Sequence, residues 1–123
     1  MLPETISPVE LTVHVLAKKW KPTILTLLAG GSRRFNRLHK ALPGVSHKVL
    51  IEQLRELEKD GIVRREAKVG GYKRVHYSLT AAGERLLPIL DAMAAWGREH
   101  ARQRGPPGAR REAAPIGSEL DSA

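Results

Sequence analysis

Apolar residues recur at helical spacing throughout the first 60 residues of the chain. Near the N-terminus, Ser7 and Glu10 stand where a capping box places its hydroxyl and its carboxylate. Apolar side chains then follow three and four positions apart, which predicts a helix from about Pro8 to Lys19. A second apolar helix is predicted to start near Pro22 and to end at Gly30–Gly31.

Two further helices are predicted on either side of a tight turn. The first is short, carries apolar residues at positions 35, 38 and 42, and ends at Pro43–Gly44. Ser46 is the predicted N-cap of the next helix, which Asp60–Gly61 closes. This helix has a leucine stripe (Leu50, Leu54 and Leu57) and a charged stripe on the opposite side. It is therefore expected to pack on a core with one face and to expose the other.

After residue 61 the apolar period changes from helical to alternating. Two β-like runs, Ile62–Val69 and Tyr72–Leu79, flank Gly70–Gly71. A Gly-Gly pair supplies the positive φ angles of a two-residue hairpin turn, and this turn would place Lys68 opposite Lys73. Like charges across a strand pair are destabilising, so the basic tip suggests a polyanionic partner.

A long helix with a wide apolar face is predicted from Thr80 to about Arg104. Residues 105–123 have no periodicity and are rich in glycine and proline, which predicts a disordered tail. The expected organisation is one domain over residues 1–104 followed by this tail. Its fold class is mainly α with a small β-hairpin.

Charge is concentrated in the middle of the chain. The formal net charge is +8, and residues 31–80 hold twelve lysines and arginines against five aspartates and glutamates. A basic stripe on one structured segment is typical of a nucleic-acid-binding surface. A basic surface that only confers solubility is the alternative reading of the charge taken alone.

Several function classes lack support in the sequence. The chain has no cysteine, which excludes disulfides, thiolate metal sites and thiol-based sensing. The five histidines show no paired metal-ligand spacing, and no nucleophile or phosphate-loop motif is present, so we expect neither an enzyme nor a cofactor. No signal peptide or membrane-spanning run is apparent, and a cytoplasmic protein is the default expectation.

The predicted order of elements is that of a winged helix-turn-helix, in which the helix after the turn enters the DNA major groove. The candidate base and phosphate contacts lie on this helix after the turn. They are its first residues and one residue two turns further on: Ser46, His47, Lys48 and Arg55. The hairpin, or wing, offers Lys68, Lys73 and Arg74 to the DNA backbone, and Arg33 ahead of the third helix is a further candidate. Together these residues form the predicted DNA-binding site.

The chain resembles the HxlR-type winged helix-turn-helix regulators of prokaryotes over about residues 7–100. The segments that carry the resemblance are "KKWKPTILTLLAGGSRRFNRLHKALPGVSHKVLIEQLRELEKDGIVRRE" and "RVHYSLTAAGERLLPILDAMAAWG". The resemblance implies a homodimeric transcriptional regulator on a pseudo-palindromic operator, nucleoid-associated when bound to double-stranded DNA. It also implies a dimer interface between the first and last helices, for which the candidates are Val13, Leu16, Leu90, Met93 and Trp96.

Two other functions compete with this interpretation. A winged helix can act as a protein-interaction module without specific DNA binding. An RNA-binding module is disfavoured, because the chain has only five aromatic residues and no cluster of them to stack unpaired bases. An apolar cleft beside the long C-terminal helix is a candidate site for an unidentified small-molecule effector.

Overall fold

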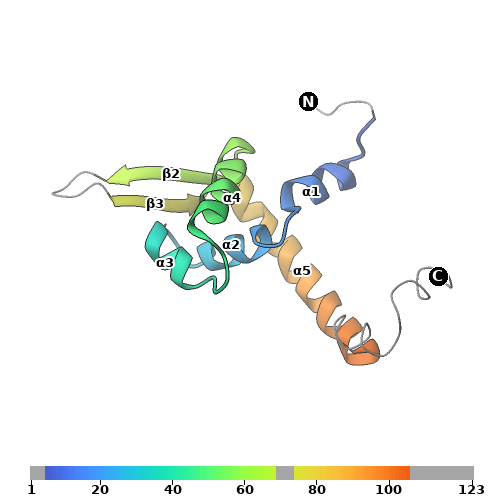
Figure 1. Cartoon of the computed structure of the whole chain (residues 1–123). Helices are drawn as coiled ribbons and strands as arrows, with labels where there is room; N and C mark the ends of the chain where they lie inside the picture. Colours follow the sequence, from blue (N-terminus) through green and yellow to red (C-terminus); the bar gives the residue numbers. More distant parts are fainter. Residues whose placement is uncertain (1–4, 69–73, 106–123) are drawn as a thin grey trace. The chain divides into compact units, whose positions relative to one another are not determined.

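The computed structural model describes residues 5–68 and 74–105 (Figure 1). Its elements follow one another in the order α1 (Pro8–Leu16), α2 (Lys21–Leu28), β1 (Arg33–Arg34), α3 (Phe35–Lys40), α4 (His47–Lys59), β2 (Val63–Lys68), β3 (Arg74–Leu79) and α5 (Ala81–Arg104). The chain is mostly helical with a small antiparallel sheet, as the sequence predicted. It divides into two units, one ending at Leu87 and the other beginning at Pro88.

The helix caps form as the sequence predicted. In α1, the Ser7 hydroxyl accepts from the Glu10 amide at 3.1 Å and the Glu10 carboxylate accepts from the Ser7 amide, which completes the capping box. In α4, the Ser46 hydroxyl accepts from the Val49 amide at 3.0 Å. Helix α1 ends three residues earlier than predicted, because Ala17 is extended and Lys18 adopts a positive φ of 92°.

The sheet has three strands in the order β1-β3-β2, and the sequence predicted only two of them. Strand β1 consists of two residues, which pair with Tyr77 and His76 of β3. A strand this short has no periodicity of its own from which it could be recognised.

The predicted hairpin register is wrong by one residue. Lys68 pairs with Arg74 rather than with Lys73, and the predicted Gly70–Gly71 turn itself lies outside the described residues. The observed register instead places Val63 opposite Leu79, and both side chains are buried. Burial of an apolar face specifies register strongly, because a slip by one residue would turn one strand's buried side chains to solvent.

One apolar core holds the first unit together. Its fully buried side chains come from α2, α3, α4, β2 and the residues that link them: Ile24, Leu25, Leu28, Leu38, Leu42, Leu50, Leu54, Leu57 and Val63. The leucine stripe of α4 is therefore buried as predicted, and the charged side of this helix faces outward. The core fixes α4 against α2 and the sheet.

The start of α5 is tied to the turn between α4 and β2. The Thr80 hydroxyl donates to the Gly61 carbonyl at 2.6 Å and accepts from the Gly83 amide at 3.1 Å. A Cβ on Gly83 would lie 2.3 Å from the Ile62 carbonyl oxygen, so this close approach requires glycine. Helix α5 runs to Arg104 as predicted, and the predicted tail from residue 106 onward lies outside the described residues.

Candidate nucleic-acid interface

The N-terminal turn of α4 projects the predicted base-contacting residues outward. Ser46, His47 and Lys48 are exposed, and so is Arg55 two turns further along the helix. The Ser46 hydroxyl oxygen already caps α4, but its proton remains available to an acceptor such as a phosphate oxygen. The leucine stripe holds this helix from behind, so its outer surface is presented on a rigid element.

His47 is not a free surface side chain, because it joins an aromatic cluster between α3, α4 and β3. Its ring meets the edge of Phe35 at a centroid distance of 4.6 Å and lies 5.9 Å from His39. Phe35 also lies 6.5 Å from Tyr77. A ring nitrogen of His39 is 3.0 Å from the Val45 carbonyl oxygen, which ties α3 to the turn before α4. The cluster therefore fixes the entry of α4 relative to α3 and the sheet.

A groove of about 910 Å³ runs between α4 and the β2–β3 hairpin. The residues that line it come from α3, α4 and all three strands: Arg34, Phe35, Asn36, His47, Ile51, Arg55, Glu58, Arg65, Arg74, Val75 and Tyr77. Four of them are arginines and one is a glutamate, so the groove carries a net positive charge. Guanidinium groups bind phosphate in a bidentate manner and remain charged at any physiological pH.

Arg33 differs from the other candidates because it already has a partner within the fold. Its side chain is half-buried, and its Nε donates to the Leu27 carbonyl at 2.8 Å. It lines a smaller hollow of about 310 Å³ together with Arg34, Arg37 and His76. Arg33 thus braces the connection from α2 to β1, and its role in DNA binding stays a prediction.

The wing is only partly described. Arg74 is exposed and lines the groove, whereas Lys73 lies outside the described residues and only the backbone pairing of Lys68 with Arg74 is described. The predicted pairing of Lys68 with Lys73 is therefore wrong, since the backbone of Lys68 pairs with that of Arg74.

The sequence suggested Arg64–Arg65 only as a possible extension of the wing contact, and the structure shows that Arg65 lines the groove from β2. Arg65 pairs with Tyr77, two residues after the buried Val63. Alternation along a strand places residues i and i+2 on the same face. The two-residue spacing between Val63 and Arg65 was therefore visible in the sequence. Which face of the sheet Arg65 shares with β3 could be decided only once the register of the hairpin was known.

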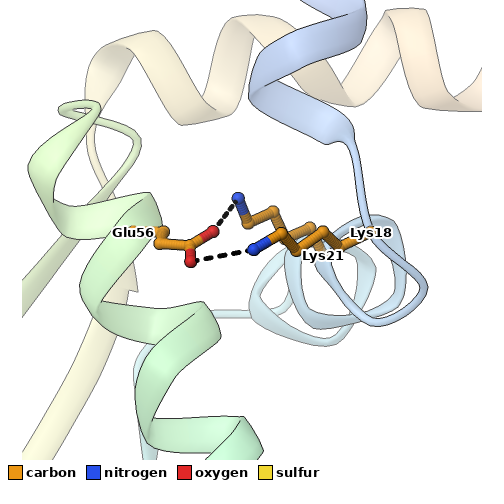
Figure 2. Close-up of polar contacts among 3 residues, drawn as sticks. All are labelled: Lys18, Lys21 and Glu56. Carbon is orange, nitrogen blue, oxygen red and sulfur yellow. Dashed lines mark hydrogen bonds and ion pairs between the residues drawn. The ribbon is translucent and has the colours of Figure 1, made fainter.

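On the opposite flank of α4, Glu56 is held by two lysines from the start of α2 and the segment before it (Figure 2). We call Lys18, Lys21 and Glu56 the lysine clamp. Lys21 Nζ lies 2.6 Å from Glu56 Oε1, and Lys18 Nζ lies 3.1 Å from Oε2. Lys21 is only 3% exposed. The hydrogen bond from Lys21, and then that from Lys18, holds the pKa of the Glu56 carboxyl below its ordinary value.

Comparison with known proteins identifies the family and the fold. Residues 15–105 match the family described as HxlR-like helix-turn-helix. The chain belongs to this family. It is 40% identical over 93 residues to a protein of Bacillus subtilis (strain 168) described as the uncharacterized HTH-type transcriptional regulator YdeP, covering 76% of this chain and 73% of that protein.

Solved structures place this HxlR-like chain among winged-helix regulators. A structure titled "Redoxregulator HypR in its reduced form" matches with a TM-score of 0.73 and 43% identity, covering 78% of this chain and 94% of that one. A putative HTH-type transcriptional regulator, ytcD, matches with a TM-score of 0.75 and 39% identity, covering 79% and 99%. The HxlR-like chain is thus a DNA-binding transcriptional regulator with a winged helix-turn-helix fold.

The candidate dimer residues of this HxlR-like protein divide into two groups by exposure. Val13 is 62% exposed on α1, and Met93 and Trp96 are 50% and 68% exposed on α5. Leu16 and Leu90 are buried in the single chain. The first group is available to a partner, whereas the second already packs within the chain.

In the parts that the structure describes, no helix combines the length and apolar character needed to cross a bilayer.

Proposed function

We propose that this HxlR-like protein binds a pseudo-palindromic operator as a homodimer and regulates transcription by occupying it. The N-terminal half of each α4 enters the major groove, and each β2–β3 wing follows the adjacent DNA backbone. The observation that carries this proposal is the groove beside α4, which four arginines line. We expect the protein to act in a prokaryotic cytoplasm, on the nucleoid when bound.

The two sides of the groove have different expected roles. Arg65 and Arg74 come from the wing and Arg34 from β1, and we assign these groove-lining side chains to phosphate contacts. Lys48 and Arg55 lie on the outer side of α4, where a recognition helix meets base edges. Phosphate contacts set affinity and register, and base contacts set sequence preference.

The homodimer is supported by apolar side chains that the described chain leaves exposed. On α1, Val9 is 72% exposed and Val13 nearly as much, and on α5 three further large apolar residues are exposed. Apolar patches of this kind mark protein–protein contacts. A second copy satisfies them symmetrically and supplies the second α4 that a palindromic site requires.

The test is a titration of the protein with a duplex that it selects from a random-sequence library, repeated at increasing salt. We expect affinity to fall steeply, by a log–log slope of about −0.9 for each phosphate neutralised. Arg65→Ala should reduce this slope by about one unit, whereas Arg85→Ala, an equal charge loss on an exposed α5 residue outside the groove, should change it little. Failure to bind any duplex in dilute buffer would refute the proposal and favour a protein-interaction module.

A further inference from the structure

The backbone of Lys18 adopts a conformation that lysine rarely takes. Its φ is 92°, and within residues 5–68 and 74–105 every other positive φ belongs to a glycine. A side chain in this region carries a steric cost that glycine avoids. Lysine at this position is therefore unfavourable for the local backbone, and its side chain must supply a compensating interaction or a function.

The side-chain contact that Lys18 makes is its ion pair with Glu56 of α4. Figure 2 shows the two ammonium groups approaching the two carboxylate oxygens from the same side. Lys21 is buried, so its ion pair ties the partly exposed Glu56 carboxylate to the core side of the fold. Lys18 is largely exposed and adds a second, directional contact from the segment that follows α1.

The position of Glu56 on α4 determines what these contacts control. Glu56 follows His47 by nine residues, which is about two and a half helical turns. It therefore lies on the flank opposite to His47, which lines the groove. The buried leucines hold α4 against the core, and the two ion pairs on one carboxylate add a directional restraint on rotation of the helix about its own axis. That rotation decides whether Lys48 and Arg55 face a base pair.

We propose that Lys18, Lys21 and Glu56 are positioning residues for sequence recognition, and that Lys18 links the end of α1 to the orientation of α4. This inference rests on the proposed function, because it concerns how the DNA-facing side of α4 is presented. The lysine clamp touches no DNA itself. It acts on specificity, because base contacts depend on side-chain geometry more strictly than phosphate contacts do.

The decisive variant is Lys18→Gly. Glycine relieves the backbone cost at φ 92° while it removes one arm of the lysine clamp, so we expect an unchanged or raised thermal midpoint. We expect the ratio of affinities for the selected duplex and a scrambled duplex of equal length to fall by about 2- to 30-fold. Lys18→Arg keeps a cation within reach of Glu56 and should restore most of this ratio. Arg85→Ala, which removes the same charge elsewhere, should leave the ratio unchanged.

The outcomes separate this inference from the function on which it rests. If the wild-type protein binds neither duplex, the proposed function fails. If the wild type discriminates between the duplexes and Lys18→Gly discriminates equally well, the lysine clamp has no positioning role and the inference is overturned. Glu56→Gln gives a second reading, because it should lower the same ratio, and a folded Glu56→Gln protein with wild-type discrimination would also contradict the proposal.

Discussion

Helices α1 and α4 start in the same way and meet different surroundings. Each is capped by a serine whose hydroxyl accepts from a backbone amide three residues on, and each has an apolar side. In α4 the apolar side is buried, with Leu50, Leu54 and Leu57 at most 1% exposed. In α1 only Leu16 is buried, and Val9 and Val13 remain largely exposed.

The difference assigns a kind of partner to each helix. The apolar side of α4 is satisfied within the chain, so only its charged outer side is left for a ligand, and arginines surround that side. The apolar side of α1 is not satisfied within the chain, so a matching apolar surface is expected to cover it. One amphipathic pattern therefore leaves a charged side exposed in α4, for which we propose DNA as the partner, and an apolar side exposed in α1, for which we propose a second protein chain.

The largest expected effect compares the same kind of truncation on the two helices. Leu54→Ala should lower the free energy of unfolding by about 2–5 kcal/mol, because it leaves a cavity in the core. Val13→Ala should change it by about 0.5 kcal/mol or less at concentrations where the protein is monomeric. Urea denaturation of both variants measures this, and equal losses would show that α1 is packed as tightly as α4.

Trp96→Ala should weaken dimerisation by about 2 kcal/mol or more, because large exposed aromatic residues dominate the energetics of interfaces. The Trp96 ring stacks on His100 at 4.7 Å, so its orientation is partly fixed before a partner binds. Sedimentation equilibrium measures the effect, with Arg98→Ala as a control on the same helix. An intact dimer in the Trp96 variant would remove α5 from the proposed interface.

The sequence predicted the elements of this fold well because their signals are local. Ser7, Ser46 and the leucine stripe of α4 act over one or two turns, and the described structure confirms each of them. The hairpin register and strand β1 depend on partners far along the chain, and there the prediction was incomplete. The glycine pair suggested a turn, but burial of Val63 opposite Leu79 sets the register.

The candidate site also divides into features that local sequence determines and features that depend on distant parts of the chain. The outward positions of Lys48 and Arg55 follow from the period of one helix, so the sequence was sufficient. The groove needs α4, β1 and the hairpin together, and Arg65 joins it only through the long-range register. The lysine clamp joins Glu56 to two lysines that precede it by 35 and 38 positions in the chain. Nothing in the sequence near Lys18 reveals that its partner is Glu56.

Two variants test the charged side of α4, and each removes one positive charge at a different position along the helix. Arg55→Ala and Lys48→Ala should each weaken binding to the selected duplex by about 1–3 kcal/mol if the side chain reads a base. Fluorescence anisotropy with selected and scrambled duplexes measures both losses. Equal losses on the two duplexes would instead assign that residue to phosphate contact, and no loss on either would exclude it from the interface.

The smallest expected effect is on the pH dependence of stability. It concerns Glu56, which connects α4 to the segment that follows α1. Because the pKa of its carboxyl is lowered in the folded protein, ionised Glu56 stabilises the fold above the ordinary glutamate pKa, and this contribution is lost as pH falls through the lowered value. The effect is modest because water reaches the carboxylate and screens its charge.

The difference in unfolding free energy between wild type and Glu56→Gln should therefore shrink as pH falls below the ordinary glutamate range. In a Lys18→Gly background the shrinkage should be smaller and should be complete at a higher pH, because one of the two hydrogen bonds that lower the pKa of folded Glu56 is gone. A difference that does not vary with pH would mean that the lysines do not hold Glu56 in its charged form, and the link between the end of α1 and α4 would then lose its electrostatic basis.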